Sequence, residues 1–219
     1  VYTLQWIHMS KPILFFDFDG VIVHSMDMWL KMAQRDYPAL TAQDFINNSM
    51  GNVHEEFAKY AELHGHKVTS IREHQDQNDL EIRNGLLKQR MVTGIDVAIR
   101  EVQEKFQLFI VTSGRKAPVK AYLEQQNLLD AFEDVYASDD DISKYKKIQM
   151  IFERTGCVSD RCLFITDTLG DLREAARANV AGIGVSWGLH DKVDLRKGDP
   201  IAMVDSVEEL VGVIQKHFS

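Results

Sequence analysis

Short runs of apolar residues recur along the chain, and each run ends at polar or small residues. Runs of about four to eight apolar residues without polar alternation are typical of strands that are buried on both faces of a sheet. We therefore predict strands at residues 13–16, 108–111, 135–137, 162–165 and 183–185.

Between the later runs, apolar residues recur at the spacing of an amphipathic helix. Residues 116–126 and 144–154 have this spacing, and residues 172–178 are rich in alanine. Strands that alternate with helices indicate a parallel sheet covered by helices. The pattern therefore predicts an α/β protein with a Rossmann-like core.

The first predicted strand departs from this alternation, because roughly 90 residues separate it from the second. The interval has helical patterns at residues 26–37, 53–64 and 70–88. We predict an α/β core domain made of residues 9–22 and 91–219, with residues 23–90 inserted as a small, all-helical cap domain. Residues 1–8 are interpreted as an extension upstream of a native start at Met9.

Polar and charged residues stand at the ends of three predicted strands and at the start of one helix. In an open α/β sheet, ligands bind beyond the carboxyl ends of the strands, so we expect these residues to meet at one edge. They are Asp17, Asp19, Thr112, Ser113, Gly114, Lys144, Asp167 and Asp171.

This combination of residue types favours phosphoryl transfer. Asp17 and Asp19 are two residues apart in an extended segment and can face one ligand. Oxygen ligands suit Mg²⁺, and a carboxylate can attack phosphorus while a second carboxylate transfers protons. Each motif alone has an ordinary explanation as a turn, a helix cap or a solvated charge. The prediction of phosphoryl transfer therefore rests on their shared position at strand ends and a helix start of one sheet.

The overall composition limits the partners. Hydrophobic residues make up 45% of the chain and the mean hydropathy is −0.23, which is typical of a globular protein. A net charge of −8 argues against nucleic acid, and no apolar run reaches the roughly 20 residues of a membrane span. The two cysteines, Cys157 and Cys162, form no disulfide framework, so we expect a reducing, cytoplasmic location.

Four segments together resemble the haloacid dehalogenase superfamily: FFDFDGVI, FIVTSG, SKYKKI and FITDTLGD. The resemblance is to the phosphatase branch with a helical C1-type cap, which includes phosphoglycolate phosphatases and β-phosphoglucomutases. It implies that Asp17 is the nucleophile and Asp19 the general acid and base. It also implies a Mg²⁺ cofactor, held by Asp17, the backbone carbonyl of Asp19 and Asp167, with Asp171 as the second acid of the metal motif.

The resemblance implies that a hydroxyl and a lysine bind the phosphoryl group. Thr112 matches the hydroxyl, with Ser113 as the alternative. Lys144 matches the lysine, because it stands 12 residues before Gly156, as in many relatives, and Lys147 is the main competitor. Gly114 and Arg115 follow as further phosphate contacts, Arg115 by recruiting a substrate anion.

The chain departs from the family pattern at two positions. Thr166 replaces the glycine that usually precedes the aspartate of the fourth motif, and a side chain there would narrow the approach to the metal. His24 stands where relatives often carry an acidic residue. We expect His24 to face the cap hinge and to affect substrate choice rather than the core reaction.

Several other residues have two possible interpretations. The segment at residues 187–190 could line the substrate pocket or pack as an ordinary loop. Met26, Met28 and Met32 are interpreted as core or cap–core contacts, and the histidines of the insert as exposed helix-end residues rather than a zinc site. Four basic residues are candidates for a second anionic group of the substrate, although solvation is their usual role: Lys59, Arg72, Arg83 and Arg90.

The expected function is Mg²⁺-dependent hydrolysis of a small phosphorylated metabolite by a monomer or homodimer. Two alternatives remain open at this stage. A phosphomutase would use the same core but return the phosphoryl group to a sugar phosphate. A non-catalytic binding module would keep the fold, although the intact Asp17, Asp19, Lys144 and Asp167 argue against it.

Overall fold

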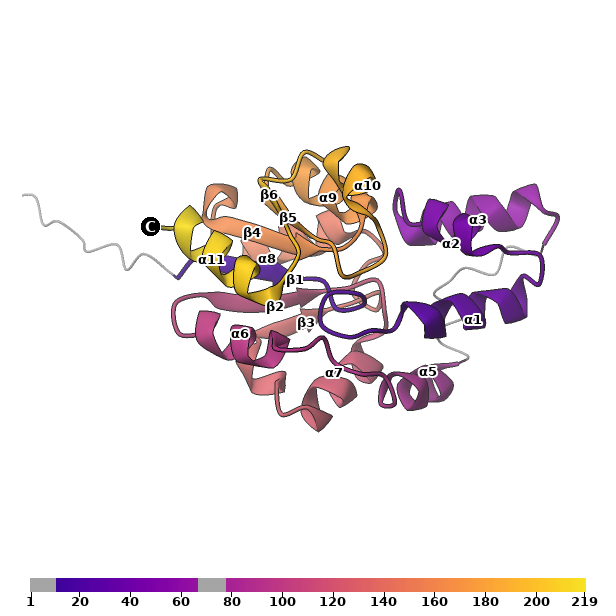
Figure 1. Cartoon of the computed structure of the whole chain (residues 1–219), viewed down its shortest axis with the longest axis horizontal. Helices are drawn as coiled ribbons and strands as arrows, with labels where there is room; N and C mark the ends of the chain where they lie inside the picture. Colours follow the sequence, from indigo (N-terminus) through magenta and orange to yellow (C-terminus); the bar gives the residue numbers. More distant parts are fainter. Residues whose placement is uncertain (1–10, 67–77) are drawn as a thin grey trace, which may run out of the picture.

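The structure is a computed structural model that describes residues 11–66 and 78–219. Its centre is a parallel sheet with the strand order β3-β2-β1-β4-β5-β6 (Figure 1). The strands are β1 Ile13–Phe16, β2 Gln107–Val111, β3 Asp134–Tyr136, β4 Cys162–Thr166, β5 Ala181–Val185 and β6 Ala202–Val204. The five predicted strands and the α/β class are confirmed. The sixth strand was missed because it has only three residues and two of them are half-buried.

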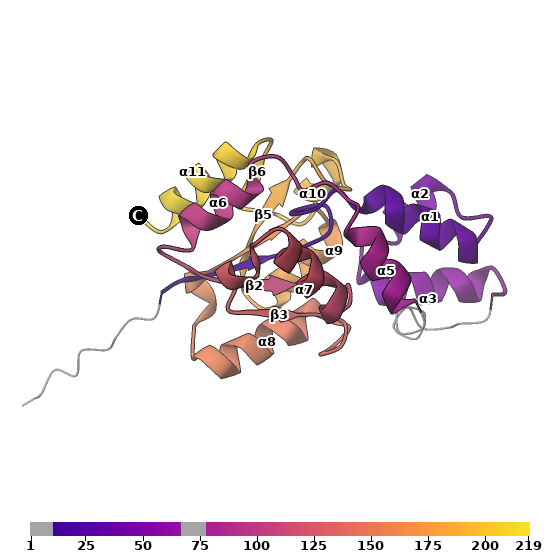
Figure 2. The same ribbon diagram turned by 90° about the horizontal axis from the view of Figure 1, so that it is seen from below.

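Side chains of the central strand β1 alternate between the two faces of the sheet. Leu14 and Phe16 pack in one hydrophobic cluster, and Ile13 and Phe15 pack in another. Figure 2 shows α6 and α11 on one side of the strands and α8 on the other. The helices of the core are α6 Ile95–Val102, α7 Lys116–Gln125, α8 Lys144–Thr155, α9 Leu169–Arg177, α10 Lys192–Arg196 and α11 Val207–His217.

Four helices that follow β1 in the chain form a helical lobe beside the sheet, at the right of Figure 1. Its described helices are α1 Met26–Asp36, α2 Ala42–Asn47, α3 Val53–Leu63 and α5 Asp79–Leu86. Phe45 and Phe57 belong to its own small hydrophobic cluster. The start of the helix expected at residues 70–88 lies outside the described residues, as do Arg72 and the extension at 1–8.

Two neighbouring segments of the chain connect the lobe to the sheet. Val23 pairs with Met91 in an antiparallel bridge, and the backbone N–H of His24 donates to the carbonyl of Arg90 at 2.9 Å. The entry and the exit of the insert therefore lie side by side. The domain boundaries at these positions remain a prediction.

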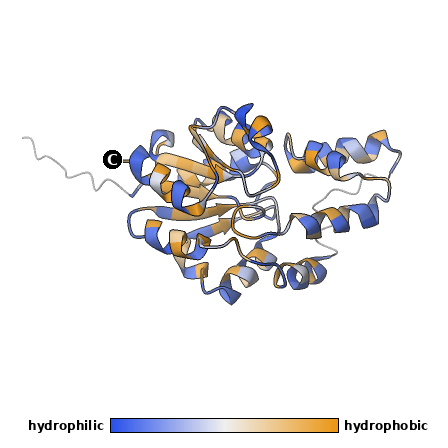
Figure 3. Cartoon of the chain, viewed as in Figure 1, coloured by the Kyte–Doolittle hydropathy of each residue, from blue (hydrophilic) through white to orange (hydrophobic). Residues whose placement is uncertain are grey.

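Hydrophobic residues gather in the strands and on the inner faces of the helices, whereas the outer helix faces are hydrophilic (Figure 3). Within residues 11–66 and 78–219, none of the helices has both the length and the hydrophobicity that crossing a membrane requires.

Candidate active site

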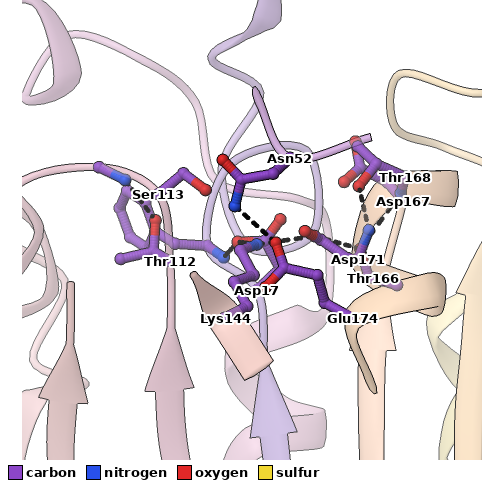
Figure 4. Close-up of polar contacts among 12 residues, drawn as sticks. Asp17, Asn52, Thr112, Ser113, Lys144, Thr166, Asp167, Thr168, Asp171 and Glu174 are labelled. Carbon is purple, nitrogen blue, oxygen red and sulfur yellow. Dashed lines mark hydrogen bonds and ion pairs between the residues drawn. The ribbon is translucent and has the colours of Figure 1, made fainter. Parts of the chain in front are cut away.

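Asp17, Lys144 and Asp171 converge at the carboxyl edge of the sheet (Figure 4). The Nζ atom of Lys144 lies 2.8 Å from Oδ1 of Asp17 and 2.7 Å from Oδ2 of Asp171. Lys144 is only 2% exposed, so water screens these ion pairs little. The structure thus brings together three residues that are far apart in the sequence.

The sheet places these residues through its register. The backbone N–H of Asp17 donates to the carbonyl of Ile165, which continues the pairing of β1 with β4 past the end of β1. Lys144 is the first residue of α8, whose N-cap is Ser143. A lysine at a helix start is disfavoured by the helix dipole, and here two carboxylates compensate for it.

Asp19 points toward the helical lobe rather than toward Lys144. Its Oδ1 accepts hydrogen bonds from the hydroxyl of Ser25 at 2.5 Å and from Nε1 of Trp29 at 2.7 Å. Burial raises the pKa of Asp19, and the two hydrogen bonds oppose this shift without cancelling it. A carboxyl group with a raised pKa is better able to hold and deliver a proton at neutral pH.

Asp167 is fully buried directly after β4. Its Oδ2 accepts the backbone N–H of Leu189 at 2.8 Å, whereas its Oδ1 has no hydrogen-bond partner among the described residues. A Cβ atom at Gly20 would lie 2.0 Å from Oδ2, and one at Gly188 would lie 2.3 Å from it. Gly20 also has a φ of +74°, so glycine is required there for its backbone angle and for the space that Asp167 occupies.

Asp171 is held by two donors through the same oxygen atom. In addition to Lys144, the hydroxyl of Thr166 donates to Oδ2 at 2.7 Å. Burial raises the pKa of Asp171, but Lys144 and the hydrogen bonds outweigh burial and lower it overall. The threonine that departs from the family pattern therefore contacts the acid of the same motif.

The pKa values of Asp17 and Asp167, unlike that of Asp171, are raised overall. Burial raises the pKa of Asp17 well above its ordinary value, against the opposing charge of Lys144, and the charges of Asp171 and Asp167 add to the rise. Burial likewise raises the pKa of Asp167 to about 7. A cation beside these groups would favour their ionised forms.

Lys147 lies one turn along α8 and is completely buried. Its Nζ donates to the backbone carbonyl of Thr112 at 2.7 Å. Burial lowers the pKa of Lys147 to about 7, and the charge of Lys144 adds to this effect. Of the two lysines considered from the sequence, Lys144 is the one that contacts Asp17, and Lys147 supports the end of β2.

The residues after β2 take different positions. Thr112 is fully buried, and its hydroxyl accepts the backbone N–H of Gly114 at 3.0 Å. Thr112, Ser113 and Gly114 all line the cavity that contains Asp17 and Asp19. Arg115 is not part of this lining: it pairs with Asp79 and Asp139, so its placement does not support the expected contact with a substrate anion.

The loop before α3 contacts the core next to the site. Asn52 donates from Nδ2 to Oε1 of Glu174 at 2.6 Å and to the carbonyl of Ile142 at 3.1 Å (Figure 4). His54 is buried, and its Nε2 lies 3.2 Å from the carbonyl oxygen of Ser113. The interpretation of His54 as an exposed helix-end residue is therefore wrong, because the first turn of α3 places its side chain against the core.

Sequence reasoning missed Asn52 and Glu174 altogether and assigned His54 to the surface. Glu174 is buried and also accepts hydrogen bonds from the hydroxyl of Ser143 and the N–H of Tyr145. An acidic residue within the helical pattern after the fourth motif was the only signal. Such a glutamate is normally solvated, so the signal is weak.

A cavity of about 470 Å³ extends from the carboxylates into the helical lobe. Leu189 contributes to its wall, so the segment at residues 187–190 both packs on Asp167 and reaches the pocket. Met26 and Met32 line it as well. His24 does not line it, and its side chain is exposed at the hinge.

The donor set at this edge fits a hard divalent cation. The unpartnered buried oxygen of Asp167 and the side chain of Asp17 are oxygen ligands of the kind that Mg²⁺ selects. Among the described residues, no three acidic, histidine or cysteine side chains form a complete metal cage. Mg²⁺ commonly binds one or two carboxylates and completes its coordination shell with water and phosphate.

Two curated relatives match parts of the chain. A protein named "Probable phosphatase IndB" from Dickeya dadantii (strain 3937) is 32% identical over 110 residues, which cover 49% of this chain and 48% of that protein. A "Phosphoglycolate phosphatase" from Synechococcus elongatus is 22% identical over 107 residues, which cover 49% and 50%. The matched segments thus span about half the length of these relatives.

A solved structure gives the likeness over nearly the whole fold. The HAD-hydrolase YfnB from Bacillus subtilis, whose structure is bound to magnesium, superposes with a TM-score of 0.63 at 20% identity. The superposition covers 93% of this chain and 98% of that one. At this identity the likeness establishes the fold.

The sequence profile of the family described as "Haloacid dehalogenase-like hydrolase" matches residues 14–185. This segment contains all four motifs and the whole helical insert, and it ends with β5. The resemblance drawn from the motifs is confirmed, and the chain belongs to the haloacid dehalogenase-like hydrolase family.

Proposed function

We propose that the chain is a Mg²⁺-dependent phosphatase that hydrolyses a phosphate monoester through an aspartyl-phosphate on Asp17. The observation that carries the proposal is the position of Lys144 on Asp17, beside the unpartnered buried oxygen of Asp167. The phosphatase name of a relative and the magnesium in a related structure support it.

In the first step, a carboxylate oxygen of Asp17 attacks phosphorus, and the bond from phosphorus to the alcohol oxygen breaks. Asp19 gives its proton to the leaving oxygen. In the second step, Asp19 takes a proton from water, which attacks phosphorus and releases inorganic phosphate and free Asp17. Asp19 suits both roles because burial raises its pKa and because Ser25 and Trp29 fix its orientation.

The remaining residues bind charge and position groups. Thr112, the N–H groups after β2 and Lys144 are proposed to bind the phosphoryl oxygens. Asp17, Asp167 and the backbone carbonyl of Asp19 would hold Mg²⁺, which when bound neutralises phosphoryl charge. For Asp171 we propose chiefly the orientation of Lys144, because its Oδ2 is already engaged by Lys144 and Thr166.

The test is phosphate release from ethyl phosphate and acetyl phosphate by the purified chain, with and without Mg²⁺. We expect Asp17→Asn to lower kcat at least about 10³-fold, since it removes the nucleophile. Asp27→Asn, an exposed aspartate on α1, is the matched control and should leave the rate unchanged. Mg²⁺-dependent turnover that survives in Asp17→Asn would rule the mechanism out.

The same assay addresses the mutase alternative. A phosphomutase would release little phosphate to water and would require a sugar bisphosphate for activity. The proposal of a phosphatase predicts steady release without any bisphosphate.

A further inference from the structure

One face of α1 forms a wall of the cavity from the catalytic carboxylates outward. Met26, Trp29, Met32 and Asp36 line the cavity and are spaced three or four residues apart, which places them in one stripe along the helix. At 1.5 Å per residue, this stripe runs about 15 Å. The cavity therefore extends along α1, and the helical lobe contributes about half of its lining.

The opposite wall is also apolar. Phe45 from α2 and Val53 and Phe57 from α3 line it, and Leu189 closes it from the core. The rings of Phe45 and Phe57 lie 5.9 Å apart in an edge-to-face arrangement. Aromatic and methionine side chains on facing walls are suited to hold an apolar ring system.

Trp29 connects the chemistry with this apolar wall. Its Nε1 donates to Oδ1 of Asp19, and the residue also lines the cavity. A leaving oxygen protonated by Asp19 must lie close to that carboxyl group. The first carbon atoms of the leaving group would then run along Trp29 toward Met32.

Cations are scarce in this cavity. Of the described residues that line it, Lys144 is the sole lysine or arginine, and Asp17 and Asp171 already pair with it. The outer end carries Asp36, which pairs with Arg35 at 3.6 Å, and His66, whose ring meets Tyr37 edge-on.

Of the four basic residues considered from the sequence, the three that the structure describes do not change this picture, and Arg72 lies outside the described residues. Lys59 is exposed and pairs with Glu56 at 2.7 Å. Arg83 and Arg90 are exposed and do not line the cavity. Within the part of the lining that the structure describes, a second anionic group of a substrate would therefore meet mainly methionine and aromatic side chains and would lose much of its hydration.

We propose that the substrate is the phosphate monoester of an uncharged, largely apolar alcohol that carries a ring system. This inference rests on the proposed phosphatase function and adds the substrate class to it. A two-carbon acid such as phosphoglycolate would leave most of the cavity empty and would place its carboxylate against Trp29. Each additional buried methylene in such a pocket raises kcat/KM by about tenfold or more.

The test compares four primary alkyl phosphates whose leaving alcohols react similarly: ethyl phosphate, butyl phosphate, 3-phenylpropyl phosphate and 4-phosphooxybutanoate. We expect kcat/KM for 3-phenylpropyl phosphate to exceed that for ethyl phosphate at least tenfold. We expect 4-phosphooxybutanoate to fall below butyl phosphate, because it places a carboxylate in the apolar part. Equal values, or a preference for the carboxylate, would overturn the inference while Asp17-dependent hydrolysis would still stand.

A charge variant sharpens the comparison. Met32→Lys should shift the ratio of kcat/KM for 3-phenylpropyl phosphate over 4-phosphooxybutanoate at least tenfold toward the carboxylate. Lys31→Met, at an exposed position on the same helix, changes the charge outside the cavity and should leave this ratio unchanged. A shift of the same size in both variants would show that net charge, and not the cavity, sets the preference.

A binding measurement separates this inference from the proposed function. Calorimetry with 3-phenylpropylphosphonate and 4-phosphonobutanoate reports preference without turnover. If no ester is hydrolysed, the phosphatase proposal fails. The substrate inference would then fail as well. Binding of 3-phenylpropylphosphonate at least tenfold more tightly than 4-phosphonobutanoate would still support the cavity's preference for an apolar ring.

Discussion

The hydroxyl of Thr166 donates a hydrogen bond to Oδ2 of Asp171, with 2.7 Å between the two oxygen atoms. Both side chains are buried, and the same oxygen also accepts from Nζ of Lys144. The resemblance implies that glycine usually stands at this position, and a sequence with glycine there lacks this donor. Thr166 therefore helps to orient Asp171, and Asp171 in turn helps to orient Lys144.

We predict that Thr166→Val weakens this arrangement, because valine keeps the shape of threonine and removes the donor. The free energy of unfolding should fall by about 1.5–3 kcal/mol, the range for a hydrogen bond to a charged group. The rate of phosphate release should fall about threefold to tenfold. Thr166→Ser, which retains the hydroxyl, should restore most of both in denaturation and rate measurements, and failure of that rescue would contradict the role of the bond.

Lys144 is predicted to be required for turnover rather than for binding alone. Lys144→Met should lower kcat by about 10²–10³-fold, because a buried donor at the reacting group is lost in the transition state. Lys146→Met is the control: this neighbour is exposed and pairs only with Asp141, at 3.3 Å, among the described contacts. An unchanged kcat in Lys144→Met with a raised KM would assign the lysine to ground-state binding instead.

Lys147 should make stability depend on pH. Its pKa is lowered by burial to about 7 in the folded chain, whereas an unfolded lysine titrates near 10.5. Between these values the unfolded chain binds one more proton, so the free energy of unfolding rises with pH, by up to about 1.4 kcal/mol per pH unit. Below pH 7 both states are protonated, and the slope from this group vanishes.

Urea titrations of the wild-type chain and Lys147→Met between about pH 7 and the ordinary pKa of cysteine, about 8.5, measure this slope. The lower limit matters because burial raises the pKa of Asp167 to about 7, which removes stability as pH rises toward 7. The upper limit matters because burial raises the pKa of Cys162 well above its ordinary value, which removes stability at higher pH. We expect the positive slope in the wild type and its absence in the variant. Parallel curves would mean that Lys147 keeps its proton throughout.

The sequence predicts the site best where one strand positions one residue. Asp17, Thr112 and Asp167 each follow a buried run, and parallel strands deliver their carboxyl ends to a common edge. The position of Lys144 follows in the same way from the start of α8. Lys144 contacts Asp17, whereas Lys147 contacts the carbonyl of Thr112. Which lysine meets which partner depends on how α8 is rotated about its axis, and periodicity alone does not determine this rotation.

The sequence predicts the contacts between lobe and sheet poorly. Asn52 reads as an ordinary helix N-cap, and it does accept the N–H of His54. Its second contact joins it to Glu174, 122 residues away, and this contact exists only because the loop before α3 lies against the core. A pattern of neighbouring residues in the sequence does not predict a contact of this kind.

This contact provides the last prediction, since it holds the loop before α3 on the core. Asn52→Asp should keep the cap of α3, because aspartate is an equally good N-cap. It would, however, replace the Nδ2 donor with a carboxylate that faces buried Glu174. Repulsion between the two carboxylates should favour an open lobe and raise KM about tenfold, which corresponds to about 1.4 kcal/mol.

Two comparisons distinguish opening of the lobe from general damage to the fold. Adding Glu174→Gln to Asn52→Asp should restore KM, because an amide can donate to the new carboxylate. Asn47→Asp, at an exposed position in the same lobe, should leave KM unchanged. Hydrogen exchange should be faster around residues 49–54 in Asn52→Asp alone. If KM and exchange match the wild type in Asn52→Asp, the contact between Asn52 and Glu174 does not control closure.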